Sequence, residues 1–225
     1  MTNVYTRISR PDRKLIEQFR QIGVATVYEA AGRVGSIDPG IRPLRRGLRI
    51  IGPAVTVHCH PKDNLMLHKA LQIAQEGDVI VATTDGYHNA GYWGGLMTTS
   101  ALARKVAGLA IDACVRDSAE IVETGFPVFC RGTCIRGTAK DILGTVNHPI
   151  LFGDIMVNPG DLILGDDDGM VAIPQADIER VLEASRKRIE KEKGKAAALA
   201  SGTSSVELNK LDKVFESLGL VEEQP

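Results

Sequence analysis

The chain has 225 residues, with 27 basic and 28 acidic side chains and a formal net charge of −1. This balance provides no electrostatic footprint for nucleic acid or for a membrane surface, so we expect neither as a partner and a small molecule instead. The length suffices for one substantial core. The first 14 residues hold no apolar leader and no stretch is apolar over a membrane-spanning length, so a cytoplasmic location is expected.

The first third of the chain is predicted to contain three helices and one long strand. Apolar residues recur at helical spacing between Pro11, which suits the first position of a helix, and Gly23, which ends the run. Asp63 is positioned to cap a later helix. The predicted elements are helices over residues 11–22, 24–31 and 63–74 and a strand over residues 48–59.

From Asp78 onward, short apolar runs alternate with helical patterns, which is typical of an α/β domain with parallel strands. Turn residues then bracket two short apolar runs that indicate a β-hairpin, and Pro174 ends the sheet region. The predicted elements are strands over 79–82, 109–115 and 127–130, helices over 96–106 and 118–124, and hairpin strands over 162–164 and 170–173.

Residues 175–200 form a long, charge-rich helical pattern with a narrow apolar stripe. A polar helix of this length is expected to gain little from packing on its own subunit and to lie across a neighbour instead. The sequence therefore predicts an α/β domain over residues 1–174 and a C-terminal helical extension over residues 175–225 that packs on a neighbouring subunit.

The segment 91–117 is the main candidate for function. A glycine-rich turn opens a helix, whose first N–H groups are free to bind a small carboxylate or phosphate. The strand that follows ends on Arg116, whose guanidinium fork suits a carboxylate or enolate oxygen, and on Asp117, which offers a hard oxygen ligand. The alternative is a surface ion pair in which Asp117 only caps the next helix.

Other candidates for chemistry are weaker. His58 and His60 share one face of a strand but lack a nearby third ligand for a metal. The acidic run 166–168 lacks the ligand spacing of a calcium loop and is interpreted as a turn. No CxxC pair occurs, so the cysteines are expected to be reduced thiols: Cys59, Cys114, Cys130 and Cys134.

Several common enzyme classes are disfavoured because their motifs are missing. The chain has no GxSxG, no HExxH, no P-loop, and no GxGxxG after a strand. A metal-assisted reaction on a small oxo acid remains compatible with the segment 91–117.

Six segments in one order carry a family resemblance: GVATVYEAAGRVG at 23–35, the strand ending in HPKDN, the 91–117 core, ETGFPVF, GTVNHPI, and VNPGDLILGDDDGMVAIP at 157–174. Over most of its length the chain resembles the class II pyruvate aldolases of aromatic-acid breakdown, the 4-hydroxy-4-methyl-2-oxoglutarate / 4-carboxy-4-hydroxy-2-oxoadipate aldolases, and the related RraA-like proteins. The resemblance implies an α/β fold, a compact ββα sandwich resembling the swivelling phosphohistidine domain. It also implies a homotrimer or homohexamer with active sites between subunits.

The resemblance further implies a lyase that releases pyruvate from a 2-oxo acid. A divalent metal, Mg²⁺ or Mn²⁺, is expected on Asp117. Arg116 is expected to steady the keto oxygen as it becomes an enolate. The substrate carboxylate is expected on the turn and the helix start formed by Gly94, Gly95, Leu96 and Met97.

One position departs from the family pattern, in which an acidic residue precedes Arg-Asp by twenty intervening positions. That position is Gly95 here. Glu192, or Glu190, from a neighbour's C-terminal helix is the expected replacement; the alternative is that both lie on a solvated helix face. Oxaloacetate decarboxylation requires no hydroxyl deprotonation and is expected to tolerate Gly95 better than aldol cleavage.

A second hypothesis belongs to a different class of protein. RraA proteins share the resemblance but bind and inhibit ribonuclease E without a metal, so the chain could be a non-catalytic partner of a ribonuclease. RraA proteins depart from the Arg-Asp pattern, whereas this chain keeps both Arg116 and Asp117. The sequence therefore favours an enzyme.

Overall fold

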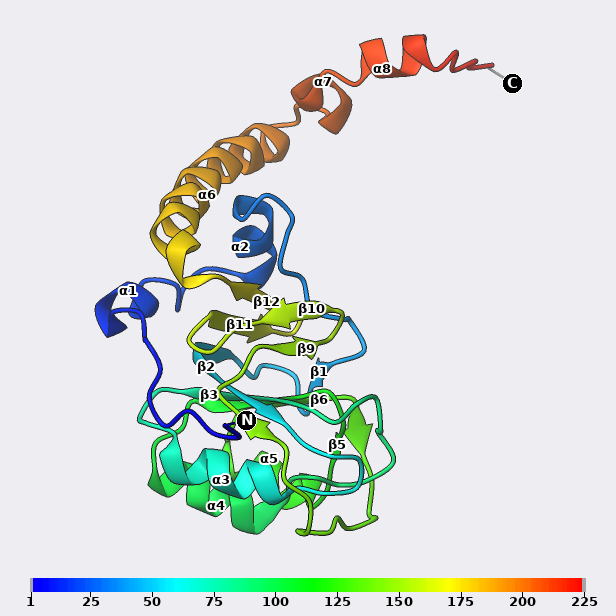
Figure 1. The fold of residues 1–225 in the computed structure, drawn as a ribbon. Coiled ribbons are helices and arrows are strands. Elements are labelled where there is room, and N and C mark those ends of the chain that lie inside the picture. The colour runs from blue at the N-terminus through cyan, green and yellow to red at the C-terminus, as the bar shows by residue number, and fades with distance from the viewer. Residues whose placement is uncertain (1, 224–225) are drawn as a thin grey trace.

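The computed structural model describes residues 2–223, and its centre is an eight-stranded mixed sheet (Figure 1). The main strand order is β1-β6-β4-β3-β2-β11-β12, and β8 also pairs with β2. The four strands β6, β4, β3 and β2 are parallel, whereas β1, β8, β11 and β12 each run antiparallel to their partners. The strands are β1 (Arg42–Pro43), β2 (Ile50–His58), β3 (Val79–Thr83), β4 (Gly108–Ile111), β6 (Val128–Cys130), β8 (Thr145–Val146), β11 (Leu162–Asp166) and β12 (Gly169–Ile173).

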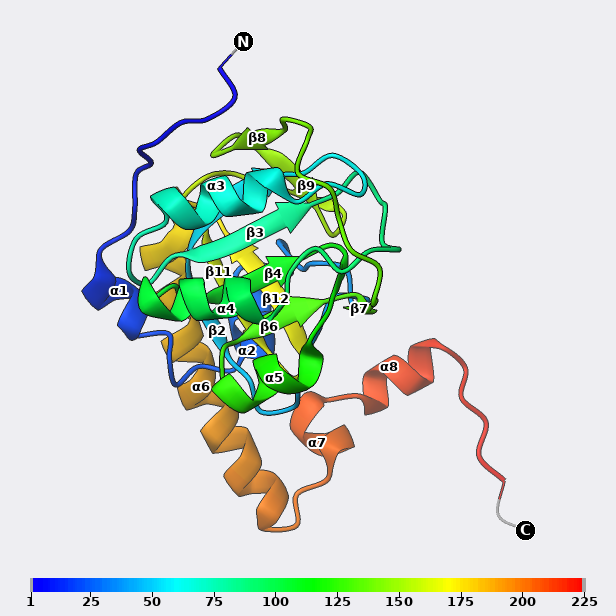
Figure 2. The same cartoon turned by 90° about the horizontal axis from the view of Figure 1, so that it is seen from below.

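Three helices connect the parallel strands and cover one face of the sheet (Figures 1 and 2). They are α3 (Leu65–Ile73), α4 (Gly95–Ala103) and α5 (Ser118–Thr124). Each of them joins one parallel strand to the next, as the alternating pattern of the sequence predicts. The prediction of an α/β domain with parallel strand pairs is confirmed.

The opposite face of the sheet is covered by a hairpin rather than by helices. Its strands are β9 (Ile150–Phe152) and β10 (Ile155–Val157), which pair antiparallel. All five residues of β3 are buried, because the helices cover one of its faces and the β9–β10 layer the other. The resulting order of hairpin, sheet and helices is the expected ββα sandwich.

Two predicted elements differ clearly from the sequence pattern. The N-terminal helix is only α1 (Arg13–Glu17); Phe19 and Ile22 are buried from the turn that follows it, so tertiary packing ends the helix early. The predicted strand 109–115 divides into β4 and a separate β5 (Cys114–Val115), which pairs with β7 (Gly132–Thr133). The strand breaks after Ile111, because the Asp112 side chain turns toward Arg131, whose Nε donates to Asp112 Oδ1 at 2.6 Å.

The C-terminal helix α6 (Ile178–Ala200) packs on its own chain over its first half. Val181 and Leu182 are buried with α2 (Val24–Ala30) and the β11–β12 hairpin, and Ser185 is also buried. The expectation that this helix gains little stability by packing on its own subunit is therefore wrong for its first half. This half completes a hydrophobic core of the same domain. Although α6 is long, no helix within residues 2–223 is apolar enough to cross a bilayer.

The second half of α6 projects away from the domain, followed by α7 (Ser205–Asn209) and α8 (Asp212–Ser217) (Figure 1). This arm exposes large apolar side chains, and exposed apolar patches mark interaction sites. Docking of the arm on a neighbouring subunit stays a prediction. The exposed side chains are Leu199, Val214, Phe215, Leu218, Leu220 and Val221.

We expect the full chain to be a trimer or hexamer at micromolar concentration in light scattering coupled to size exclusion. Replacing Phe215 and Leu218 together by glutamate should shift it to smaller species, because both side chains belong to the exposed apolar set. Lys213→Glu on the same helix is the control for added negative charge. A monomeric full chain would contradict a site shared between subunits.

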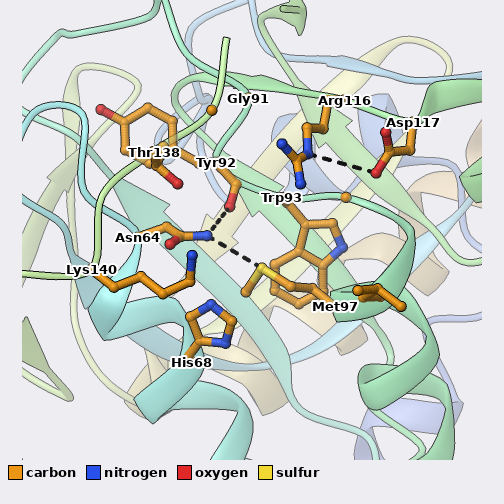
Figure 3. A pocket seen from close by; sticks show the side chains of 13 residues that line it. Asn64, His68, Gly91, Tyr92, Trp93, Met97, Arg116, Asp117, Thr138 and Lys140 are labelled. Carbon is orange, nitrogen blue, oxygen red and sulfur yellow. Dashed lines mark hydrogen bonds and ion pairs between the residues drawn. The ribbon is translucent and has the colours of Figure 1, made fainter. Parts of the chain in front are cut away.

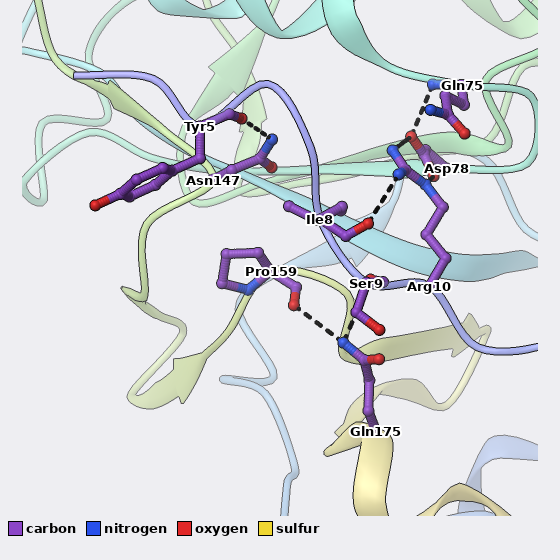
Figure 4. Close-up of polar contacts among 9 residues, drawn as sticks. All are labelled: Tyr5, Ile8, Ser9, Arg10, Gln75, Asp78, Asn147, Pro159 and Gln175. Atoms are coloured by element: carbon purple, nitrogen blue, oxygen red, sulfur yellow. Dashed lines mark hydrogen bonds and ion pairs between the residues drawn. The ribbon is translucent and has the colours of Figure 1, made fainter. Parts of the chain in front are cut away.

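The N-terminal segment crosses the domain as a strap and is held by polar contacts (Figure 4). Arg10 binds the buried carboxylate of Asp78 through two N–H groups, each 2.7 Å from an oxygen. Asn147 Nδ2 donates to the Tyr5 carbonyl at 2.6 Å, and Gln175 Nε2 donates to the Ser9 carbonyl at 3.4 Å. The strap thereby links the start of the chain to the β3 and β8 regions and to the segment leading into α6.

Candidate functional site

A cavity of about 250 Å³ lies at the N-terminal end of α4 (Figure 3). Stretches far apart in the sequence meet there: the start of α3, the glycine-rich turn, the β5–α5 corner and the loop after β7. Its lining consists of Asn64, His68, Gly91, Tyr92, Trp93, Gly94, Leu96, Met97, Arg116, Asp117, Gly137, Thr138 and Lys140.

The glycines of the turn provide space rather than an unusual backbone conformation. Gly91, Gly94 and Gly95 all lie outside the set of residues with positive φ. A Cβ built on Gly94 would collide with the Asp117 carboxylate, and one on Gly91 would come within 2.9 Å of Arg116 Cβ. The turn therefore lets the two side chains of the β5–α5 corner approach its backbone closely.

Buried aromatic residues hold the turn in place. Trp93 is fully buried, stacks on Phe126 with ring centroids 6.1 Å apart, and donates from Nε1 to Thr98 Oγ1 at 2.8 Å. The Trp93 carbonyl accepts the Arg116 N–H at 2.8 Å, and the Tyr92 N–H donates to the Cys114 carbonyl at 3.0 Å. These bonds fix the β5–α5 corner to the start of α4.

Asp117 directs its carboxylate at α4 rather than at its own helix. Its backbone is left-handed, with φ 55°, a conformation that non-glycine residues adopt at a cost and that often marks functional sites. The carboxylate accepts the Gly95 N–H at 3.1 Å and makes no capping bond to α5. Asp117 occupies the N-cap position of α5 and lies 3.7 Å from Arg116 Nε, as the alternative of a surface ion pair at a helix start predicts, but its side chain does not cap that helix.

The start of α4 and Arg116 form a cradle for an anion. The N–H groups of Leu96 and Met97 have no acceptor within the described part of the chain, as expected for a first helical turn. Arg116 is half exposed, and its Nε lies 3.7 Å from Asp117 Oδ2. Because two free N–H groups, a helix N-terminus and a guanidinium meet at one cavity, a small carboxylate fits there.

The donor set at the corner fits one kind of metal. Among residues 2–223, no group of three His, Cys, Asp or Glu side chains is arranged to hold an ion, which disfavours a closed zinc site. Mg²⁺ and Mn²⁺ are commonly held by one or two carboxylates, with water and substrate oxygens completing the shell. The Asp117 carboxylate, 42% exposed beside an open cavity, suits that mode of binding.

Asn64, His68, Thr138 and Lys140 line the cavity and were missed by the sequence analysis. Asn64 Nδ2 donates to the Tyr92 carbonyl at 2.8 Å, whereas its Oδ1 is buried without a partner in the described residues. Burial lowers the pKa of His68, and the charge of nearby Lys140 lowers it further, so the imidazole is neutral at neutral pH. In the sequence, the one indication of this side of the cavity was the HPKDN segment, which contains Asn64.

The buried carboxylate of Asp63 holds the loop that carries Lys140. It accepts the N–H groups of Leu65, Asp141 and Ile142 at 2.6–3.0 Å, so it both starts α3 and anchors the loop. Burial opposes ionisation of Asp63, but these three N–H groups hold its pKa below the usual value. The N-cap position of α3 is Asn64 rather than the predicted Asp63, although the Asp63 carboxylate accepts the first N–H of the helix and also helps to place Lys140.

A family model described as "RraA-like: Aldolase/RraA" matches residues 24–172, about two thirds of the chain. The chain belongs to this family. A protein of Halalkalibacterium halodurans named "Putative 4-hydroxy-4-methyl-2-oxoglutarate aldolase" is 32% identical over 199 residues, covering 88% of this chain and 95% of the relative. The RraA-like resemblance inferred from the sequence is confirmed.

Solved structures share the fold of this chain. An uncharacterized protein from Pseudomonas syringae pv. tomato is 27% identical with a TM-score of 0.78, covering 88% of this chain and 97% of its own. Streptomyces coelicolor RraAS2, described as an unusual member of the RNase ES inhibitor RraA protein family, is 26% identical with a TM-score of 0.77, covering 84% and 99%. The expected RraA-like fold with a long C-terminal helix is therefore confirmed.

Glu192 lies far from the cavity within one chain of this RraA-like protein. It sits on the projecting half of α6, at the other end of the molecule from α4, and pairs with Arg188 Nε at 2.7 Å (Figure 1). Glu190, the other candidate, pairs with Lys193 Nζ at 2.7 Å. A contribution of either residue to a neighbour's site stays a prediction.

The weaker candidates have structural partners. His58 Nε2 lies 2.8 Å from Asp85 Oδ1, and His60 Nδ1 lies 3.2 Å from the Pro61 carbonyl. All four cysteines are free, and burial raises the pKa of Cys59 to about 12. The acidic run forms the β11–β12 turn, as predicted, with Asp166 accepting the Val24 N–H at 2.9 Å.

Proposed function

We propose that this RraA-like protein is a divalent-metal-dependent carbon–carbon lyase that releases pyruvate from a pyruvate-derived 2-oxo acid. The reaction is of the 4-hydroxy-4-methyl-2-oxoglutarate / 4-carboxy-4-hydroxy-2-oxoadipate aldolase type, with oxaloacetate decarboxylation as a second activity. The observation that carries this proposal is the meeting of two free α4 N–H groups, Arg116 and Asp117 at one cavity. The name of the 32% identical relative supports the same reaction class.

Each group of the cradle has a role in this reaction. The N–H groups of Leu96 and Met97 bind the substrate carboxylate and thereby orient the neighbouring keto group. The Arg116 guanidinium faces the keto oxygen and stabilises the negative charge that develops there as the enolate forms. Asp117 holds the divalent metal, Mg²⁺ or Mn²⁺, which when bound supplies Lewis-acid polarisation of the 2-oxo acid.

The far wall of the cavity accepts the part of the substrate beyond the pyruvoyl group. Lys140 places a positive charge there, and Asn64 Oδ1 offers an unused acceptor. A second carboxylate or hydroxyl group on the substrate would match these groups. The assembly that we propose, a homotrimer or homohexamer, would bring a neighbour's arm with Glu192 to the open side of this cavity.

Pyruvate release measured with and without metal tests the proposal. The full chain is assayed with 4-hydroxy-4-methyl-2-oxoglutarate and with oxaloacetate, after chelation and after adding Mg²⁺ or Mn²⁺. We expect pyruvate from at least one substrate only when metal is present, because the cradle alone does not stabilise the enolate fully. The same rate with and without metal, or no pyruvate from either substrate, would contradict it.

The likeness to RraAS2 favours one alternative, a non-catalytic protein that binds a ribonuclease. Replacing the Asp117 carboxylate distinguishes the two functions, because a protein that only binds a ribonuclease does not need a metal ligand. Under the alternative, Asp117→Ala and chelation leave ribonuclease binding unchanged and the chain releases no pyruvate. Under the proposed function, the same substitution removes pyruvate release.

A further inference from the structure

The carboxylate of Glu120 fills the space above Gly95. Glu120 lies in the first turn of α5, and its carboxylate lies beside Gly95, whose N–H donates to the Asp117 carboxylate. A Cβ built on Gly95 would come closer than 3.0 Å to both oxygens and the carboxyl carbon of Glu120. Gly95 does not have positive φ, so the space for Glu120 is the physical reason for a glycine at this position.

Contacts within the chain give Glu120 no structural partner. Across residues 2–223 its carboxylate makes neither a hydrogen bond nor an ion pair, although it is exposed and many exposed acids of this chain are paired. The neighbouring N–H of Gly95 is already taken by Asp117. A carboxylate without a partner thus lies beside Gly95 at the start of α4, next to the Leu96 residue of the cradle.

We propose that Glu120 is the proton acceptor for aldol cleavage and supplies from α5 the carboxylate that position 95 lacks. This inference rests on the proposed function. In the step, the 4-hydroxyl proton of the substrate passes to the Glu120 carboxylate and the C4–O bond becomes a carbonyl. The electron pair of the C3–C4 bond moves into the pyruvate enolate, whose oxygen faces Arg116. Glu120 is restored when a proton is returned to C3 of the enolate.

The two reactions of the site separate this role from a structural one. Decarboxylation of oxaloacetate forms the same enolate but removes no hydroxyl proton, so it does not require Glu120. A residue that merely supports the fold would affect both reactions together. The ratio of the two activities therefore reports on the proton acceptor itself.

The experiment compares Glu120→Gln with Glu123→Gln, an exposed acid on the same helix. We expect Glu120→Gln to lower kcat for aldol cleavage by about 10²-fold or more, the range of general-base assistance. Decarboxylation should change little, and Glu123→Gln should leave both rates unchanged. Equal losses in both reactions, or no loss of aldol cleavage in an active protein, would overturn the inference.

Moving the carboxylate from position 120 to position 95 should restore aldol cleavage. Glu120→Ala combined with Gly95→Asp removes the side chain above residue 95 and places an acid there, so aldol cleavage should recover most of the loss seen with Glu120→Ala alone. Gly95→Asp by itself should bring no gain, because the new side chain and Glu120 compete for one space. No recovery in the double variant, or aldol cleavage above the wild-type rate in Gly95→Asp alone, would overturn the inference.

Metal binding provides a readout that needs no turnover. Titration of the resting protein with Mn²⁺, followed by electron paramagnetic resonance of the free ion, should show affinity weakened about tenfold in Glu120→Gln, as for other carboxylates near a metal. Glu123→Gln should bind as the wild type does. Unchanged Mn²⁺ affinity in Glu120→Gln would contradict the placement of Glu120 at the site. A wild type that releases no pyruvate from either substrate would instead overturn the proposed function, and this inference with it.

Discussion

Asp117→Asn should lower metal-dependent pyruvate release from both substrates by about 10³-fold, because Lewis-acid assistance is worth several kcal/mol of transition-state stabilisation. Asparagine tolerates the left-handed backbone of this position and still accepts the Gly95 N–H, so the corner should keep its shape. What the substitution removes is the negative charge that we assign to metal binding. The measurement is kcat for both substrates across a series of Mn²⁺ concentrations.

Two comparisons test whether Asp117→Asn loses activity through lower stability rather than through weaker metal binding. The thermal midpoint of Asp117→Asn should lie close to that of the wild type, since the side chain is 42% exposed. Asp112→Asn is the contrasting variant: Asp112 pairs with Arg131 away from the cavity lining, so stability rather than metal affinity should fall. An Asp117→Asn variant with wild-type metal dependence would contradict the assignment of Asp117 as the metal ligand.

Arg116→Ala should reduce kcat for both substrates by about 10²- to 10³-fold, the usual cost of removing one donor that faces a developing oxyanion. Both reactions pass through the same enolate, so both should fall alike, in contrast to the selective loss expected for Glu120→Gln. Arg116→Lys should recover part of the rate, because it keeps the charge but loses the planar fork. The assay is steady-state pyruvate release with each substrate.

The separation of kcat from KM makes the Arg116 prediction specific. If the guanidinium only binds the substrate carboxylate in the ground state, KM should rise while kcat stays unchanged. That outcome would place Arg116 together with Leu96 and Met97 on the carboxylate and would contradict the role of Arg116 at the keto oxygen. A fall in kcat with little change in KM supports the role that we assign.

Local patterns in the sequence predicted most elements of the domain correctly. The helix 118–124 agrees with α5, because its limits are set by adjacent residues: a left-handed Asp117 at its start and a left-handed Gly125 at its end. The strand predicted over 109–115 failed, because the break depends on the pairing of Asp112 with Arg131, nineteen positions away. The packing of α6 on α2 likewise depends on a surface that is far away in the sequence.

The candidate site was predictable where its parts are contiguous. One segment contains the glycine turn, the free N–H groups of α4 and the Arg116–Asp117 pair. The chemical roles of these groups could therefore be proposed from the sequence, without knowledge of how the structure arranges them. Lys140 reaches the cavity because the Asp63 carboxylate and backbone bonds to Ala139 anchor its loop, contacts between segments far apart in the sequence. Glu120 could not be identified from the sequence, because a glycine at position 95 does not indicate which residue occupies the space beside it.

The central claim is that the start of α4 and the Asp117 corner bind a 2-oxo acid together with a divalent metal. A crystal of the full chain grown with Mn²⁺ and oxalate, a planar mimic of pyruvate enolate, tests it most directly through the anomalous scattering of manganese. We predict a manganese peak in direct contact with an Asp117 carboxylate oxygen, and oxalate oxygens within hydrogen-bond distance of the Leu96 and Met97 N–H groups. Manganese and oxalate bound elsewhere, or oxalate bound in the cradle with no metal on Asp117, would contradict the account.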